Sequence, residues 1–306
     1  MVIKFNNKVV TYNSKWVSKS ELNPNPLNLP PYTIRVKYAS GTRPTGGSIQ
    51  TLVDAEENIW DVYYPNTNWS NLFKVTSSED IYNLLEVLGA NTANVYNMSN
   101  MFSGNYSLTS VAYFDTSAVT DMSSMFYYTG LTSVPLFDTS SVTNMSSMLR
   151  SCSSLTSVSL FDTSNVTDMS YMFSYCYGLT SVPLFNTSNV TDMSYMFSYC
   201  YGLTSVPLFD TSNVTNMNNM FYMQSSSLVP YTSQLTTVPL FDTSKVTITA
   251  GMFMNCYNVE SGALALYQQM SSQANPPEYK ANTFRNCGSN TVTGAAELAQ
   301  IPSGWK

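Results

Sequence analysis

The sequence predicts a mainly β solenoid, and its internal period is the first observation behind that prediction. A unit reading L-T-S-V-P-L-F-D-T-S-N-V-T-D-M-S-x-M-F-S-x-C-x-x recurs at spacings of 24, 23, 24, 24, 24 and 32 residues, opening at Leu84, Leu108, Leu131, Leu155, Leu179, Leu203 and Leu235. All five cysteines stand at one place in this unit: Cys152, Cys176, Cys200, Cys256 and Cys287. Such a period is typical of coils that bury apolar residues only by stacking on their neighbours. We expect about seven coils, ~34 Å long at one strand spacing per coil.

Each unit reads as a short strand, a turn and a return segment. The spacing Leu-x-x-Val-x-Leu indicates a short strand with one buried face. Phe-Asp-Thr-Ser-Asn is typical of a turn, because Asx and hydroxyl side chains bond backbone amides two residues on. Val-Thr-Asp-Met-Ser-x-Met-Phe then returns with its valine, methionine and phenylalanine side chains inward. Eight extra residues in the sixth unit predict a surface loop around 224–233.

Two segments precede the repeats. Residues 1–32 contain a predicted hairpin over 1–17 and then a Pro/Asn-rich extended arm, which is unsuited to a central strand. Residues 33–83 predict a small β-rich module with strand-like runs at 33–38 and 59–64. A short helix is expected over 78–88, because serine opens that stretch and acidic residues fill its first turn.

The repeats span 84–258, and the residues after them predict a cap. A helix is expected over 260–272, followed by a degenerate coil and a final segment at 295–301. The ends of a solenoid must not expose apolar strands, so we interpret 259–306 as a partly helical C-terminal cap.

The composition argues against several classes of function. Only 10% of residues are charged and the net charge is -6, so nothing favours binding to nucleic acid or an anionic membrane. The absence of histidine removes the commonest general base, the commonest zinc ligand and any Ser/His/Asp triad. No apolar run approaches the ~18 residues of a membrane span. We expect a non-enzymatic protein with no cofactor, no membrane insertion and, because the start lacks an apolar leader, no export by that route.

The sulfur-containing residues predict core ladders. Stacked coils lie ~4.8 Å apart, so equivalent cysteines form a row of buried thiols, which tolerates their odd number. A bridge between Cys176 and Cys200 is the alternative. Thirteen of 17 methionines occupy two repeat positions and are expected to fill the coil centre, with a metal-binding row as the alternative.

Acidic residues and asparagines form two further rows. One row contains Asn97, Asp121, Asn144, Asp168, Asp192 and Asn216, and the other contains Asp115, Asp138, Asp162, Asn186, Asp210 and Asp242. Calcium between coils is the functional interpretation, whereas closure of turns by Asx side chains is the structural one. Asparagine replaces aspartate freely in both rows, which favours turn closure and a protein without a metal site. A glycosidase-like carboxylate pair is the catalytic alternative, but carboxylates at that spacing arise in any solenoid with aspartate in its repeat, and the sequence shows no environment that would raise the pKa of one of them.

The position between Met-Ser and Met-Phe changes from unit to unit while its neighbours stay the same. Tyrosine is frequent at this position and near it, and tyrosine combines large amphipathic area with hydrogen bonding. The candidate ligand-binding residues are Tyr171, Tyr195, Tyr175, Tyr199, Tyr177, Tyr201, Tyr127 and Tyr128. The alternative is that the tyrosines stack on one another only for stability.

The unit opening at Leu179 resembles the BspA-type leucine-rich-repeat surface-protein family. The shared elements are Asp/Asn-Thr-Ser, Val-Thr-Asp-Met and Met-Phe-x-x-Cys, repeated over 84–258. The resemblance implies a leucine-rich-repeat-like solenoid, mostly found in bacterial surface adhesins, with relatives in phage structural proteins. Short flanking stretches, Leu29-Pro-Pro-Tyr-Thr-Ile-Arg and Gly294-Ala-Ala-Glu-Leu-Ala-Gln-Ile-Pro, are similar to repeat proteins of gut phages.

These resemblances imply a virion structural protein that displays the solenoid for binding to a host-surface glycan or protein. Residues 1–32 would attach it to other virion proteins, because an extended arm can order on a partner. A purely architectural virion component packed on its neighbours and a bacterial cell-surface adhesin are the alternatives. Self-association of the chain stays open.

Overall fold

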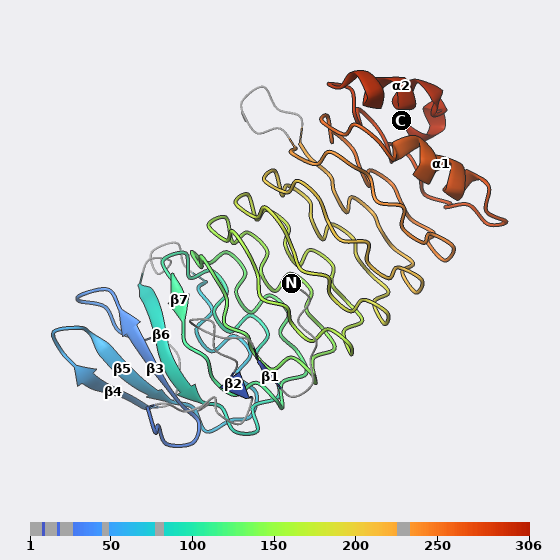
Figure 1. Cartoon of the computed structure of the whole chain (residues 1–306). Helices are drawn as coiled ribbons and strands as arrows, with labels where there is room; N and C mark the ends of the chain where they lie inside the picture. Colours follow the sequence, from blue (N-terminus) through green and yellow to red (C-terminus); the bar gives the residue numbers. More distant parts are fainter. Residues whose placement is uncertain (1–7, 10–16, 19–26, 45–48, 77–82, 225–232) are drawn as a thin grey trace.

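The computed structural model describes residues 8–9, 17–18, 27–44, 49–76, 83–224 and 233–306. A small β-sheet lies at the N-terminal end, a long row of coils follows, and two helices lie at the C-terminal end (Figure 1). We call the row of coils the repeat stack. Its coils carry almost no regular strand, so turns and extended segments make up most of the protein.

The N-terminal sheet contains five strands in the order β4-β5-β3-β6-β7. The predicted strands are present as β3 (Thr33–Tyr38) and β5 (Ile59–Tyr63), which pair antiparallel. The edge strand β4 (Ile49–Asp54) was not predicted. Farther upstream, β1 (Lys8–Val9) and β2 (Val17–Ser18) also pair antiparallel, in agreement with a hairpin, while most of the predicted arm lies outside the described residues.

The predicted helix over 78–88 is wrong wherever its residues are described. Residues 84–91 form the strand β6 (Leu84–Asn91), which lies between β3 and β7 (Ser110–Val111). Burial of Leu84, Val87 and Ala90 against the sheet outweighs the local helix signals. The first part of the predicted helix, 78–82, lies outside the described residues. Strand β6 pairs parallel with β7 and thereby joins the sheet to the repeat stack.

Successive coils pair through parallel bridges on the return segment. The bridges join Asn97 to Asp121 and continue one coil at a time as far as Asn216 and Ile248. Coil geometry also extends past the predicted repeats, since Asn68 pairs with Asn97 before them and Ile248 pairs with Tyr279 after them. Trp69 and Phe73, both buried, occupy the places of the inward methionine and phenylalanine in that early half-coil.

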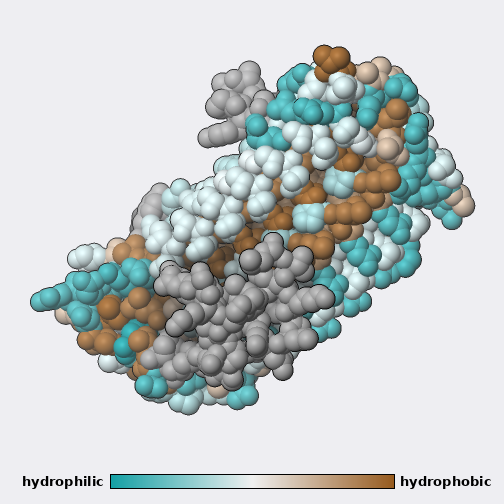
Figure 2. All heavy atoms as spheres, viewed as in Figure 1, coloured by the Kyte–Doolittle hydropathy of each residue, from teal (hydrophilic) through white to brown (hydrophobic). Residues whose placement is uncertain are grey.

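The strand predicted at Leu-x-x-Val-x-Leu is present only in the first two units. In later units the segment is extended but forms no regular ladder, and its second leucine faces outward, with Leu184 60% exposed. Proline before this leucine, as at Pro183, has no N–H to donate to a ladder. The inward residue is instead the phenylalanine that follows, Phe185, which is 2% exposed. Hydrophobic surface accordingly follows the repeat stack on the face shown in Figure 2.

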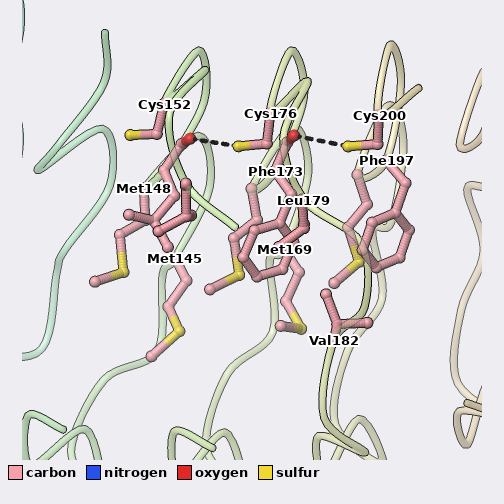
Figure 3. Close-up of a cluster of buried hydrophobic side chains, with 14 of the residues drawn as sticks. Met145, Met148, Cys152, Met169, Phe173, Cys176, Leu179, Val182, Phe197 and Cys200 are labelled. Carbon is pink, nitrogen blue, oxygen red and sulfur yellow. Dashed lines mark hydrogen bonds between the residues drawn. The ribbon is translucent and has the colours of Figure 1, made fainter. Parts of the chain in front are cut away.

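The core of the stack consists of side-chain ladders, as predicted. Both methionine rows are fully buried. Phenylalanine rings stack from coil to coil, with centroids 5.7 Å apart for Phe173–Phe197 and 5.4 Å for Phe197–Phe221. Figure 3 shows methionine, phenylalanine and cysteine side chains repeating in register through three coils. Each coil therefore depends on its neighbours for its core contacts.

The C-terminal end carries the predicted helix, α1 (Ala263–Ser271), and a second helix, α2 (Val292–Gln300), over most of the predicted final segment. Between them the degenerate coil adds Phe284, which stacks on Phe253 at 6.0 Å. The short 3-10 helix η2 (Ser303–Trp305) places Trp305 against Phe284, with ring centroids 6.4 Å apart. This tryptophan covers the last ring of the phenylalanine row.

Candidate functional site: a tyrosine-lined hollow

Turn closure accounts for both Asx rows. In the row of bridging residues, Ser170 donates its backbone N–H to Asp168 Oδ1 at 2.8 Å, and in the other row Ser212 donates to Asp210 Oδ1 at 3.0 Å. The same bond recurs with asparagine, as from Ser188 to Asn186. No group of three or more metal-ligating His, Cys, Asp or Glu side chains exists within the described residues. The hydrogen bonds show that Asx side chains close the turns in both rows, as the structural interpretation predicted.

The cysteine row consists of free, buried thiols, as predicted. Each of four thiols donates to a carbonyl of the preceding coil, as Cys176 does to Leu149 O at 3.1 Å and Cys200 to Phe173 O at 3.0 Å (Figure 3). Burial raises the pKa of Cys152 to about 11 and that of Cys200 to about 12. The row is part of the core and offers no reactive thiolate.

The variable position has a left-handed backbone in every coil. Its φ lies between 52° and 64° at Asn71, Asn100, Ser124, Ser147, Tyr171, Tyr195, Asn219, Gly251 and Asn282. Asparagine and glycine tolerate this region best, whereas tyrosine has no such preference. Tyr175 and Tyr199 stand at a second left-handed position, with φ of 64° and 61°. Two coils thus place four tyrosines where the backbone favours smaller residues.

These four tyrosines form two stacked pairs on one edge of the repeat stack. The rings of Tyr171 and Tyr195 lie 4.5 Å apart and nearly parallel, and those of Tyr175 and Tyr199 lie 4.2 Å apart. Backbone bonds between coils hold the pairs, for example Tyr171 N to Ser194 O at 2.9 Å. Tyr222 from the next coil meets Tyr199 edge-on at 5.3 Å.

The two pairs line a hollow of about 520 Å³. We call it the tyrosine hollow, and its lining residues are Arg150, Tyr171, Ser174, Tyr175, Tyr195, Tyr199, Asn219, Tyr222 and Met254. Its origin is visible at the repeat position that follows the inward phenylalanine. Two central coils have serine there, Ser174 and Ser198, whereas the flanking coils have Arg150 and Tyr222. Two short side chains between two long ones leave a depression two coils wide.

Arg150 lies at one end of the hollow among aromatic rings. Its guanidinium carbon is 4.8 Å from the centroid of Tyr171, 5.7 Å from that of Tyr127 and 5.9 Å from that of Tyr175. Its Nε is buried without a hydrogen-bond partner, and so is the hydroxyl of Ser174, a residue that is 1% exposed. Cation–π contact uses the face of the guanidinium and leaves its in-plane donors free.

The remaining candidate tyrosines lie around the hollow rather than in its lining. Tyr177 is 39% exposed and meets Tyr175 edge-on, whereas Tyr201 is only 5% exposed, which corrects its assignment to the binding surface. Tyr127 contacts Arg150, and Tyr128 packs at a tilt against Tyr106, with ring centroids 5.4 Å apart. Tyr201 is buried because it packs against the coil that carries the extra loop.

Ser174 and Met254 were missed as site residues, and Arg150 and Tyr222 were noted only as variable positions. The signal for them is the contrast in side-chain size at one repeat position, which identifies a depression only once the coils are stacked.

Ionisation in the hollow favours binding over catalysis. Burial raises the pKa of Tyr171 and, more strongly, that of Tyr199, so their hydroxyls stay protonated at neutral pH. Arg150 acts in the opposite direction on Tyr171 but does not outweigh burial. A nucleophile or general base needs a pKa near neutrality, whereas the pKa of these two hydroxyls is shifted further above neutrality. The hollow can donate hydrogen bonds from hydroxyl and guanidinium groups.

Helices that are both long and apolar enough to cross a membrane do not occur in the described part of the chain.

Two solved structures share similarity with the chain. One is a leucine rich cell surface protein from Faecalibacterium prausnitzii A2-165, 17% identical with a TM-score of 0.36, and the match covers 69% of this chain and 61% of that one. The chain thus spans less than two thirds of that protein. The other is a leucine-rich repeat protein from Bacteroides ovatus ATCC 8483, 19% identical with a TM-score of 0.35, covering 74% and 68%. No curated protein matches the chain.

A family model described as "Mycoplasma protein of unknown function, DUF285" matches residues 67–176, 131–230 and 177–275. Together these overlapping matches span 67–275, more than half of the 306 residues, and they coincide with the repeat stack. The chain belongs to the DUF285 family of repeat proteins.

Proposed function

We propose that the chain is a non-enzymatic adhesion protein of a bacterial cell surface that binds a glycan or protein ligand in the tyrosine hollow. The observation that carries the proposal is the hollow itself, which gathers four stacked tyrosines, a guanidinium and a buried, unbonded serine hydroxyl. The BspA-type resemblance of the repeats supports the location.

The left-handed backbone of the four tyrosines carries a conformational cost. Tyrosine in the left-handed region costs about 1–2 kcal/mol more than glycine would, and the two coils accept it four times. Stacking of each pair offsets part of that cost, about 0.5–1.5 kcal/mol per aromatic pair. Left-handed positions recur in every coil, but these two coils fill both of them with tyrosine, and that choice of residue points to a role beyond stability.

The tyrosine side chains also suit recognition. Tyrosine presents rigid, amphipathic area at low entropic cost and carries a hydroxyl that can bond a sugar or a peptide group. The hollow is open to ligand, and it lies on an extended surface of the kind that repeat proteins use for binding.

The finer expectations on location and partners stay proposals. Attachment through residues 1–32 would leave the repeat stack projecting, and this holds for a cell envelope as well as for a phage particle. The phage location depends on short flanking stretches, whereas the surface-protein resemblance depends on repeats over 84–258. We therefore place the protein on the bacterial cell surface, and the identity of its neighbours would distinguish an architectural role.

The test compares the whole chain with Tyr171→Ser/Tyr195→Ser on a glycan array and on intact gut bacteria. Serine occupies the same position at Ser124 and Ser147, so the double variant keeps a residue that the coil already accepts. The matched control is Tyr96→Thr, because Tyr96 is 46% exposed and threonine stands at the equivalent place in the next coils, as at Thr120. We expect the double variant to lose binding and the control to keep it. Binding kept by both would refute the hollow as the site.

A further inference from the structure

We propose that the tyrosine hollow selects acidic saccharides, with Arg150 and Ser174 holding the carboxylate while tyrosine hydroxyls and ring edges contact the sugar. This inference rests on the proposed function and names the chemical class of its ligand. It starts from the charge distribution, since Arg150 is the only basic residue between Lys74 and Lys245. The net charge of the chain is -6, and the one basic side chain in the roughly half of the sequence between Lys74 and Lys245 lines the hollow.

The contacts of Arg150 leave it ready for an anion. No ion pair joins it to a carboxylate of the described residues, and no hydrogen bond from its side chain ends on them. The three surrounding rings contact the guanidinium through its faces or edges and hold it in place. A planar guanidinium with free in-plane donors matches a carboxylate in a bidentate geometry.

Ser174 supplies the second, independent observation. It is 1% exposed, its hydroxyl has no partner, and it lines the hollow beside Arg150. Buried polar groups are rarely left unbonded, and one that faces a hollow points to a ligand oxygen. Its counterpart one coil on, Ser198, already donates to Tyr222 O at 3.2 Å. The unbonded hydroxyl is therefore the one next to the cation.

One acidic side chain near the hollow is already engaged. Asp192 influences Tyr171 electrostatically, but its Oδ1 accepts from Ser194 N at 2.7 Å and its Oδ2 from Asn216 Nδ2 at 2.9 Å. It closes its turn instead of pairing with Arg150. The cation therefore remains available to a ligand carboxylate.

The tyrosine hydroxyls and ring edges complete the site. Stacking within each pair and contact with the guanidinium occupy the ring faces near Arg150, so a sugar bound through its carboxylate meets the hydroxyls and edges of these rings. A uronic acid combines a carboxylate with a pyranose ring, which fits both contacts. A free small anion would use only the first.

The experiment measures the affinity of the whole chain for trigalacturonic acid and for neutral galactotriose by calorimetry. Two variants are compared. Arg150→Ser places the serine of Ser174 and Ser198 at this position, and Lys245→Asn places the asparagine of Asn213 at its own repeat position, so both remove one positive charge. Circular dichroism confirms that each variant is folded. We expect the acidic sugar to bind at least tenfold more tightly than the neutral one, and Arg150→Ser, but not Lys245→Asn, to remove that difference. Added salt should weaken the binding of the acidic sugar more than that of the neutral sugar.

The outcomes separate this inference from the proposed function. Equal affinity for both sugars, lost in Tyr171→Ser/Tyr195→Ser, would overturn the acidic selectivity and leave the hollow as a binding site. Acidic preference that Arg150→Ser retains would likewise overturn the assignment to Arg150. If neither sugar binds, the acidic-saccharide inference fails, while binding to cells in the array experiment still decides the proposed function by itself.

Discussion

Truncation of Phe197 tests how strongly neighbouring coils depend on one another. This side chain is fully buried and stacks on Phe173 at 5.7 Å and on Phe221 at 5.4 Å, so one residue joins three coils. Phenylalanine-to-alanine substitutions in cores cost about 3–5 kcal/mol. Three aromatic pairs, with Phe173, Phe209 and Phe221, contribute about 0.5–1.5 kcal/mol each to that cost, which places Phe197→Ala in the upper part of the range.

The chain supplies its own control for this prediction. Leucine stands at the same repeat position in one coil, as Leu149, where it is also fully buried. Phe197→Leu keeps most of the volume, so we expect it to cost less than about 2 kcal/mol. Urea unfolding followed by circular dichroism gives both values, with tyrosine fluorescence as a second probe of cooperativity. A cost below about 1 kcal/mol for Phe197→Ala, or equal costs for both variants, would refute the ladder as the main source of coil cohesion.

Three further predictions follow from the same coil geometry. Ser147→Asn should raise the free energy of unfolding by about 0.5–1 kcal/mol, and Ser147→Val should lower it by more than about 1 kcal/mol, because φ at this residue is 57°. A higher melting temperature for the valine variant than for the asparagine variant would contradict the left-handed assignment. Burial raises the pKa of Cys152 to about 11 and that of Cys200 to about 12. The stabilisation from neutral thiols is therefore complete below the unfolded thiol pKa of about 8.5 and is lost as pH rises toward 11–12. An aromatic disulfide reagent at pH 8 should leave the folded protein unmodified, and fast labelling would refute the buried row. Chelation by EDTA should leave the melting temperature unchanged, because Asx side chains close turns without metal, and a drop restored by calcium would revive the calcium interpretation.

The ladders could be predicted from the sequence because identical spacing places identical side chains in register. The methionine, phenylalanine and cysteine rows follow from the period alone, and so does turn closure by aspartate and asparagine. The strand at 84–91 could not be recognised, because its burial depends on β3, which pairs with it from about 50 residues upstream. Local propensity favoured a helix there, and tertiary pairing decided otherwise.

The outward leucines show a second limit. The spacing Leu-x-x-Val-x-Leu predicted a short strand with one buried face, yet in a later unit Leu184 faces outward and Phe185 inward. Proline one residue earlier offered the correct signal, because it is incompatible with a regular ladder. Likewise, asparagine, serine and glycine at the variable position indicated a left-handed backbone, which explains why this position tolerates change.

The candidate site was predictable in part. Four of the five tyrosines that line the hollow were identified from their variable positions, because ligand-binding side chains are not dictated by packing. The depression between them could not be foreseen, since it comes from two serines stacked between Arg150 and Tyr222 on different coils. A size contrast of this kind becomes a site only after stacking brings the four positions side by side.

The most direct test of the binding hollow is hydroxyl-radical footprinting of the whole chain, with and without bound gut bacteria, read by mass spectrometry. We predict that bound bacteria lower the oxidation of the pairs Tyr171–Tyr195 and Tyr175–Tyr199. The oxidation of Tyr96 and Tyr279, which are 46% and 57% exposed, should stay unchanged. Protection along the outward leucines, such as Leu184, with the four hollow tyrosines unaffected, would contradict the account and move recognition to the other face of the repeat stack.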